Sequence, residues 1–324
     1  MYESYFGLKE KPFHITPDAD FLYLSEKHRS AMAMLEYGVF EQSGIVVLTG
    51  TVGAGKTTLV RHLLSTAPYG EITIGLVSNV QASLGNLLQW VAMALELHSG
   101  EAELTNTQAF RRLQDYLINE YSQGRRVVLV IDEAQNMSVE SLEELRMLIN
   151  INADKNQLLQ IVLVGQPELQ TVLEQPRLTQ FAQRVTAEYH LEALNFIETR
   201  AYIRSRLHTA GCAENSKLFT SDAAAVVYYF SAGLPRLINT LCDHAMVLAY
   251  GGDQKSIDFQ IAIDTIKQKR IGGINRHGKQ PADAPTLRDH IKSKYNIDLD
   301  DLYPVSTKAT KVTKAANGSL RKRQ

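Results

Sequence analysis

The chain has 324 residues, of which 44% are hydrophobic and 21% charged, as in globular proteins with a substantial core. Lys and Arg total 34 against 35 for Asp and Glu, so the overall charge does not point to a nucleic-acid-binding protein. No stretch approaches the roughly 20 apolar residues that cross a bilayer, and residues 1–6 lack a secretion signal. The two cysteines, Cys212 and Cys242, have neither metal-ligand nor CxxC spacing. We therefore expect a reduced, cytoplasmic protein with no direct membrane span.

An N-terminal arm precedes the first predicted helix. It is too apolar for a disordered tail and too interrupted by proline for a helix, so we expect it to pack on the core. The spacing of Met32, Leu35 and Val39 then predicts a helix over residues 26–40. The aromatic and proline residues of the arm are Phe6, Pro12, Phe13, Pro17, Phe21 and Tyr23.

A glycine-rich loop follows the first apolar run of the chain, residues 45–48. Residues 50–57 read Gly-Thr-Val-Gly-Ala-Gly-Lys-Thr, and a helical pattern continues from residue 58. This order predicts a phosphate cradle, because glycines let backbone N–H groups turn around an anion at a helix N-terminus. We expect Lys56 to reach the β and γ phosphates of ATP and Thr57 to ligate Mg²⁺. The alternative is an ordinary glycine-rich turn. The predicted nucleotide-binding residues are Gly50, Thr51, Val52, Gly53, Ala54, Gly55, Lys56, Thr57 and Thr58.

Two carboxylates end a second apolar run, residues 127–131. An unbroken aliphatic run of this kind is typical of a strand buried on both faces of a parallel sheet. Ligands of such sheets bind at the carboxyl ends of the strands, which is where Asp132 and Glu133 emerge. We expect Asp132 to hold Mg²⁺ and Glu133 to orient or deprotonate the attacking water. The alternative is a pair of acids that cap a surface strand.

Apolar strands and helical segments alternate up to residue 193, which predicts an α/β fold with a parallel sheet covered on both faces. The predicted strands are 45–49, 72–77, 127–131, 160–165 and 186–190. The predicted helices after the loop are 57–66, 83–97, 106–122, 138–150 and 168–174.

Gln166 follows another apolar strand, residues 160–165. If this strand lies between the strand of the glycine loop and the strand of Asp132, the Gln166 amide is expected to contact the γ phosphate or the attacking water. Otherwise Gln166 only caps the next helix.

An arginine is the residue type that stabilises the negative charge developing during phosphoryl transfer. Arg184 lies just before the last strand, at the edge of the protomer, and is expected to reach a neighbouring protomer's site in an oligomer. Arg177 is the alternative for this arginine-finger role. Both could also be ordinary surface arginines.

Helical patterns replace the strands after residue 193, at 195–210, 220–231, 235–250 and 258–269. They predict a small helical lid. Gly233 and Pro235 mark a helix start that fixes where Arg236 projects, and we expect this arginine to sense the bound phosphates. A surface or domain-interface role is the alternative. The predicted domains are the arm and first helix (1–40), the nucleotide-binding domain (41–193), the helical lid (194–271), and a linker, short helix and tail (272–324).

The last segment of the chain is predicted to hold a short helix at 286–296 and a disordered tail. The tail contains several basic residues and no acid, so it could neutralise the phosphates of duplex DNA, touch anionic lipid or simply be solvated. Its basic residues are Lys308, Lys311, Lys314, Arg321, Lys322 and Arg323.

Together these motifs resemble the AAA+ class of P-loop ATPases, which have a three-layer αβα nucleotide domain and a helical lid. Several segments narrow the resemblance to the general secretion pathway protein A (ExeA-type) ATPases, and within them to the ATPase of exosortase and exopolysaccharide loci. These segments are residues 5–13, 16–18, 21–25, 132–135, 163–169 and 233–239, together with His28.

The resemblance implies an Mg²⁺-dependent ATPase that oligomerises and works on the proteins of an envelope secretion or exopolysaccharide export system. It assigns nucleotide and magnesium to Lys56 and Thr57, magnesium and water to Asp132 and Glu133, and the two sensor roles to Gln166 and Arg236. Family members that act in secretin assembly continue into a transmembrane helix and a peptidoglycan-binding region, and the lack of both here favours the short cytosolic branch.

Two other functions stay open at this point. One is a DNA-associated AAA+ regulator of transposition or target-site selection, for which the basic tail is the main indication. The other is a nucleotide-binding scaffold that hydrolyses nothing, which the presence of Glu133 disfavours. Phe13, Tyr23 and Leu24 could form an adenine pocket or belong to the ordinary core.

Overall fold

Two compact units make up the protein in its computed structural model. The sheet unit comprises Ile15–Leu194 and Leu234–Arg236, and the helical unit comprises Met1–His14, Asn195–Gly233 and Leu237–Gln324. The structure describes residues 1–16, 18, 20–40, 44–66, 70–78, 87–97, 105–153, 156–213, 217–269, 274 and 283–302. The six basic residues of the tail and most of the predicted linker lie outside these ranges.

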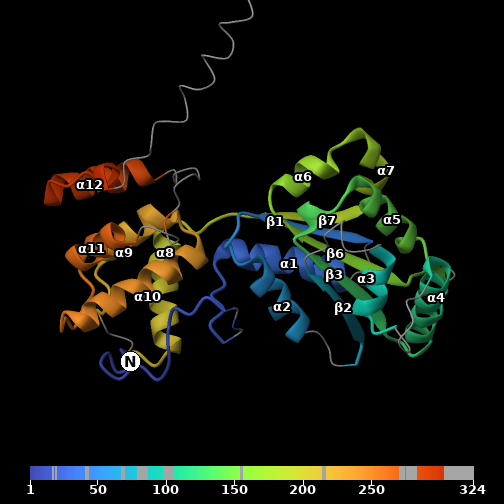
Figure 1. Ribbon diagram of the computed structural model, residues 1–324, viewed down its shortest axis with the longest axis horizontal. Coiled ribbons are helices and arrows are strands. Elements are labelled where there is room, and N and C mark those ends of the chain that lie inside the picture. The colour runs from blue at the N-terminus through green and yellow to red at the C-terminus, as the bar shows by residue number, and fades with distance from the viewer. Residues whose placement is uncertain are drawn as a thin grey trace, which may run out of the picture. The chain divides into compact units, whose positions relative to one another are not determined.

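A parallel five-stranded sheet with the order β2-β3-β6-β1-β7 forms the centre of the sheet unit (Figure 1). The sequence prediction of all five strands is confirmed, with each end correct to within one residue. The strands are β1 (Ile45–Gly50), β2 (Ile72–Ser78), β3 (Arg126–Asp132), β6 (Leu159–Gly165) and β7 (Val185–Leu191).

Burial explains why these strands were recognisable. Every residue of β1 and β6 is buried, as are the five central residues of β3, so these strands are nearly continuous apolar runs. The edge strands β2 and β7 are only partly buried, and β7 carries exposed polar residues between its buried ones. Because all five strands run parallel, β1, β3 and β6 end at the same edge of the sheet, where ligands of such folds bind.

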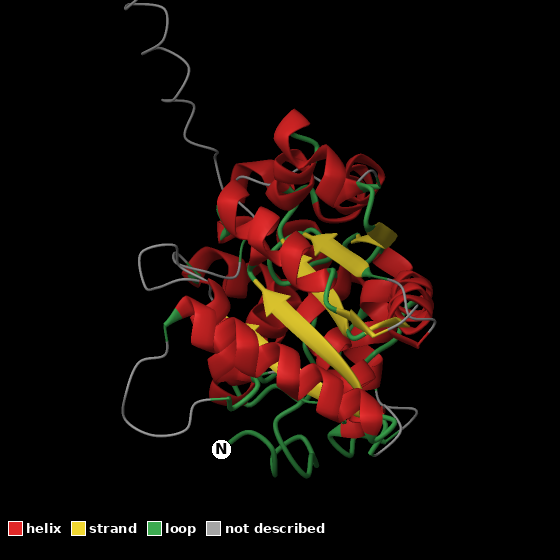
Figure 2. Cartoon of the chain, turned by 90° about the vertical axis from the view of Figure 1, so that its right-hand side faces the viewer, coloured by secondary structure: helices red, strands yellow, loops and turns green. Residues whose placement is uncertain are grey.

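Helices lie on both sides of the strands, which are yellow in Figure 2. In the sheet unit they are α1 (Glu26–Phe40), α2 (Lys56–Thr66), α3 (Leu87–Ala94), α4 (Asn106–Ser122), α5 (Val139–Ile149), α6 (Glu168–Leu173) and α7 (Thr179–Ala182). Short 3-10 turns add η1 (Ala134–Asn136) and η2 (Pro176–Leu178). A small antiparallel pair of two-residue strands, β4 (Asn152–Ala153) and β5 (Asn156–Gln157), was not predicted. Each strand is too short to show an alternation of apolar and polar residues.

The helix predicted at 83–97 is shorter than expected. It ends at Ala94, because Glu96 adopts a left-handed conformation with φ 55° and the Leu97 N–H bonds the Ala92 carbonyl. Residues 83–86 of that prediction lie outside the described ranges.

The helical unit contains the four predicted lid helices and the short helix predicted after them, with ends within two residues of expectation. They are α8 (Phe196–Thr209), α9 (Ser221–Ser231), α10 (Pro235–Gly251), α11 (Phe259–Gln268) and α12 (Ala284–Tyr295), followed by the turn η3 (Leu299–Leu302). The first two residues of α10, Pro235 and Arg236, group with the sheet unit. Across the described ranges, no helix combines the length and the apolar character that a membrane crossing requires.

The first 14 residues of the arm belong to the helical unit. Tyr2 is 1% exposed and donates a hydrogen bond to Asp243 of α10, and the Tyr5 hydroxyl donates to Asp253 at 2.7 Å. The buried Arg206 of α8 donates through Nε to the Pro12 carbonyl at 2.6 Å. Aromatic burial and polar contacts together fix this part of the arm on the helical unit.

Ion pairs attach α12 to the rest of the helical unit. Asp222, at the start of α9, accepts hydrogen bonds of 2.6 Å from Lys294 and from the Tyr295 hydroxyl. Burial raises the pKa of Asp222, but the hydrogen bonds from Lys294 and Tyr295 outweigh it, and the pKa is lowered overall. The Tyr295 ring also stacks on Phe259, with ring centroids 3.7 Å apart.

We predict that acid releases α12. Because the pKa of Asp222 is lowered in the folded protein, its contribution is complete above the ordinary value of 3.8 and is lost as the pH falls below it. Hydrogen exchange of the α12 amides, corrected for the intrinsic rate, should therefore accelerate in acid. Asp222→Asn should show the fast exchange already at neutral pH. Equal protection of α12 in both proteins at neutral pH would contradict this prediction.

Candidate nucleotide site

The glycine loop connects the end of β1 to the start of α2, as predicted. Gly53 has φ +82°, in the left-handed region, and a Cβ atom at this position would lie 2.8 Å from the Cβ of Arg236. Glycine is therefore required here both by the turn and by the close approach of another chain segment. The loop also exposes Val52, whose side chain is 50% accessible.

Lys56 lies over the loop. Its ammonium donates hydrogen bonds to the carbonyls of Gly50, at 2.7 Å, and Thr51, at 3.2 Å. The residue is only 9% exposed, and burial lowers the pKa of the ammonium against the opposing attraction of Glu133 and Asp132. The cation is thus held where it faces the carboxylates at the end of β3.

Thr57 and Asp132 meet although they are 75 residues apart in the sequence. The Thr57 hydroxyl donates a hydrogen bond of 2.9 Å to Asp132 Oδ2. The other carboxylate oxygen accepts the Glu133 N–H at 2.9 Å. The structure therefore brings together the two side chains that the sequence suggested as magnesium ligands.

Glu133 begins the turn η1 with a left-handed backbone, φ 54°. Its carboxylate accepts hydrogen bonds from Gln135, at 2.6 Å, and from Gln166, at 3.2 Å. The Gln135 bond lowers the pKa of Glu133 most, burial opposes it, and the bond from Gln166 and the charge of Lys56 lower it further. The carboxylate is consequently ionised and held in one orientation.

Gln166 lies beside the end of β3. It follows β6, and β6 lies between β3 and β1, so the topological condition stated for this residue is met. Its backbone N–H donates to Gln135 Oε1 at 2.9 Å.

Gln135 is a site residue to which the sequence analysis gave no role. It bridges the two segments, because its amide donates to Glu133 and accepts from the Gln166 backbone. Its signals in the sequence were its place two residues after Glu133 and its membership of the segment 132–135 that carries the family resemblance.

Arg236 approaches the loop through its backbone. Its N–H donates to the Gly53 carbonyl at 3.2 Å, and its Cβ packs on the Gly53 backbone. Arg236 therefore lies directly against the glycine loop.

The two candidate finger arginines are not brought to this site within one chain. Arg184 precedes β7, so it lies at the edge where the parallel strands begin, opposite to the loop at the end of β1. Its guanidinium donates to the Asn150 side chain at 3.2 Å. Arg177 lies in η2 and is exposed.

Phe13 is part of the core of the helical unit. It is 1% exposed and packs edge-on against Phe219, with ring centroids 5.8 Å apart. Of the two interpretations kept for this ring, the ordinary core applies. Tyr23 and Leu24 are half-buried in the sheet unit.

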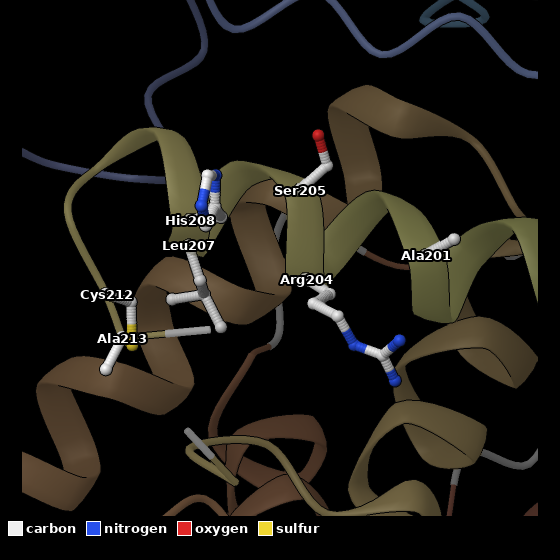
Figure 3. A pocket seen from close by; sticks show the side chains of 7 residues that line it. All are labelled: Ala201, Arg204, Ser205, Leu207, His208, Cys212 and Ala213. Carbon is white, nitrogen blue, oxygen red and sulfur yellow. The ribbon is translucent and has the colours of Figure 1, made fainter. Parts of the chain in front are cut away.

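A separate pocket of about 280 Å³ opens on α8 and the loop after it, in the helical unit (Figure 3). It contains none of the predicted nucleotide residues. The residues that line it are Ala201, Arg204, Ser205, Leu207, His208, Cys212 and Ala213.

Comparison with known proteins identifies the fold. Residues 40–173 match the family model described as AAA domain. The chain is 40% identical over 280 residues to the general secretion pathway protein A of Aeromonas hydrophila. That match covers 86% of this chain and 50% of the relative, so the chain spans about half of the relative's length.

Solved structures of AAA+ proteins are also similar. The Aeropyrum pernix ORC2 protein, in ADPNP–ADP complexes, has a TM-score of 0.56 and 14% identity, covering 87% of this chain and 86% of that chain. The Aeropyrum pernix ORC1 protein, in complex with DNA, has a TM-score of 0.58 and 17% identity. The match covers 81% of this chain and 70% of that chain. At such identities the likeness concerns the fold alone. The expected fold class is confirmed: the sheet unit is a P-loop AAA+ domain, followed by a helical domain.

Proposed function

We propose that this protein is an Mg²⁺-dependent AAA+ ATPase of the general secretion pathway protein A type. The observation that carries the proposal is the convergence of Lys56, the Thr57–Asp132 pair and the Glu133–Gln166 pair at one edge of the sheet. The 40% identity to the Aeromonas hydrophila relative supports the same family. The similarity to a protein solved with ADPNP and ADP agrees with ATP as the ligand.

The residues present fit a magnesium ion. Thr57 and Asp132 offer a hydroxyl and a carboxylate oxygen 2.9 Å apart, and Mg²⁺ prefers oxygen ligands of this kind. These two side chains would hold the ion beside the phosphates. When bound, it would neutralise the negative charge of the phosphates.

Hydrolysis requires a base beside the attacking water, and Glu133 fits this role. Its carboxylate would accept a proton from the water while the water oxygen forms a bond to the γ phosphorus. The bond between that phosphorus and the β–γ bridging oxygen breaks, and its electron pair leaves with ADP. Gln135 and Gln166 would hold Glu133 in position and keep it ionised.

Positive charge for the phosphates comes from Lys56 and Arg236. Lys56 would exchange its bonds to the loop carbonyls for bonds to the β and γ phosphates. Arg236, whose backbone touches Gly53, would connect the phosphates to the start of α10.

A complete site would include a residue of a second protomer, because neither Arg184 nor Arg177 lies at the loop of its own chain. We therefore propose a ring or filament oligomer in which Arg184 acts as the finger, with Arg177 as the alternative. Exposure of both side chains agrees with this arrangement.

For the biological role we propose cytoplasmic, ATP-driven work on the proteins of an envelope secretion system, of the exopolysaccharide-export kind. The 40% identity to a general secretion pathway protein A supports this choice.

The second candidate is a DNA-associated AAA+ regulator, supported by the likeness to an ORC1 protein solved with DNA and by the basic residues after 304. ATPase assays with and without duplex DNA at two salt concentrations separate the two, because binding to DNA phosphates weakens steeply with salt.

Glu133→Gln is predicted to keep ATP binding and to lower turnover by roughly 100-fold or more, since the amide cannot accept the proton. The matched control is Glu174→Gln, at the exposed end of α6, which should leave turnover unchanged. The measurements are phosphate release and binding of ATP. Unchanged turnover in Glu133→Gln would remove this residue from the proposed role.

Arg184→Ala is predicted to lose turnover as a pure protein and to recover it when mixed with Lys56→Ala protomers. The mixture pairs an intact nucleotide site with an intact finger, and a finger contributes roughly 10³ to 10⁵ in rate. Phosphate release from the mixture is the measurement, with Arg177→Ala tested in parallel. If Arg177→Ala mixtures recover turnover and Arg184→Ala is fully active alone, the finger is Arg177.

A further inference from the structure

His28, which belongs to the set of residues that carry the family resemblance, contacts the glycine loop. It lies in the first turn of α1 and is 4% exposed. Its Nε2 lies 3.3 Å from the Ala54 carbonyl oxygen, and its Nδ1 lies 2.8 Å from Ser25 Oγ. A buried imidazole thus joins the start of α1 to the centre of the loop.

The Ala54 carbonyl assigns a hydrogen to the ring. A carbonyl oxygen only accepts hydrogen bonds, so its contact with Nε2 requires that this nitrogen carries a hydrogen and donates it. On the other side of the ring, Nδ1 lies at hydrogen-bond distance from Ser25 Oγ, which also accepts the backbone N–H of His28 at 3.3 Å.

The next residue of the loop also touches the ring. A Cβ atom on Gly55 would lie 3.2 Å from His28 Nε2, so the Gly55 backbone packs directly on the imidazole. Gly55 has φ +104°, a conformation that glycine adopts readily. His28 thus contacts the loop at two consecutive residues.

Holding the Ala54 carbonyl has a consequence for the opposite side of the same peptide. In a trans peptide, the C=O of one residue and the N–H of the next point in opposite directions. With the Ala54 oxygen directed at His28, the Gly55 N–H is directed away from it. Backbone N–H groups of such loops are the groups that bind phosphate.

We propose that His28 is a positioning residue of the nucleotide site, which fixes the Ala54–Gly55 peptide so that the Gly55 N–H faces the phosphates. The proposal rests on the proposed function of the loop as a nucleotide site. His28 acts through the backbone and does not itself touch the nucleotide.

The helix that carries His28 is anchored by other residues. The Lys27 ammonium donates to the Ala193 carbonyl at 3.0 Å and pairs with Glu192 at 2.7 Å, just beyond the end of β7. Ala31 and Leu35 of the same helix are 0% and 1% exposed. Because these contacts do not involve the imidazole, a substitution at His28 leaves α1 attached.

Three substitutions separate positioning from packing. In His28→Gln the amide nitrogen reaches the place of Nε2 and keeps the donor to Ala54. In His28→Asn the amide nitrogen reaches only the place of Nδ1, so the donor to Ala54 is lost. His28→Leu has no donor at all. The full-length protein is titrated with inorganic tripolyphosphate, which probes the loop without a base, by displacement of a fluorescent ADP. Urea unfolding and the KM and kcat for ATP are measured on the same proteins.

We expect His28→Asn and His28→Leu to bind tripolyphosphate about fivefold to tenfold more weakly than the wild type, as for the loss of one hydrogen bond. His28→Gln should bind within about twofold of the wild type. KM for ATP should rise in the first two proteins with little change in kcat, and the order of affinities should not follow the order of urea stabilities.

Equal affinities of the Gln and Asn proteins would overturn the proposal, and so would wild-type affinity in His28→Leu. This comparison holds even if the Leu protein does not fold, because the two amides differ by one methylene group. Failure of the proposed function has a different signature, namely that the wild type itself shows no saturable binding of ADP or tripolyphosphate.

Discussion

A hydrogen bond from the Thr57 hydroxyl to the Asp132 carboxylate joins the glycine-loop helix to the end of β3. It forms only if the start of α2 and the end of β3 are neighbours in space. The strand order meets this requirement, because β1 and β3 run parallel on either side of β6. The same order brings Gln166, at the end of β6, between the loop and Glu133. The contacts of Thr57 and Gln166 with the end of β3 therefore follow from how three buried strands are arranged.

Charge and hydrogen bonding explain how the Lys56 ammonium can be buried at this site. A buried lysine is costly unless its ammonium is hydrogen-bonded and faces opposite charge. Lys56 meets both conditions through the carbonyls of Gly50 and Thr51 and the nearby carboxylates of Asp132 and Glu133.

The strands of the sheet and the main site residues could be predicted from the sequence. The reason is that the central strands are buried on both faces, so each appears as a clear apolar run. The convergence of Lys56 and Asp132 followed from those runs and from the rule that parallel strands end at one edge. Contacts made by single backbone groups could not be predicted. Nothing local in the sequence indicates that His28 meets Ala54, that Gln135 bridges Glu133 to β6, or that residues 1–14 pack with the helical unit. These contacts depend on how segments that are far apart in the sequence come together in the folded protein.

We propose that the loop of Lys56 and the end of β3 form one site for a metal-bound triphosphate. Calorimetric titration of the full-length protein with ATP, with and without Mg²⁺, tests it most directly when repeated on Thr57→Val, which keeps the shape of the side chain but removes the hydroxyl. We predict one saturable site for ATP per chain. Magnesium should raise the affinity of this site for ATP in the wild type and raise it much less in Thr57→Val. No saturable binding at millimolar ATP, or an equal effect of magnesium in both proteins, would contradict the account.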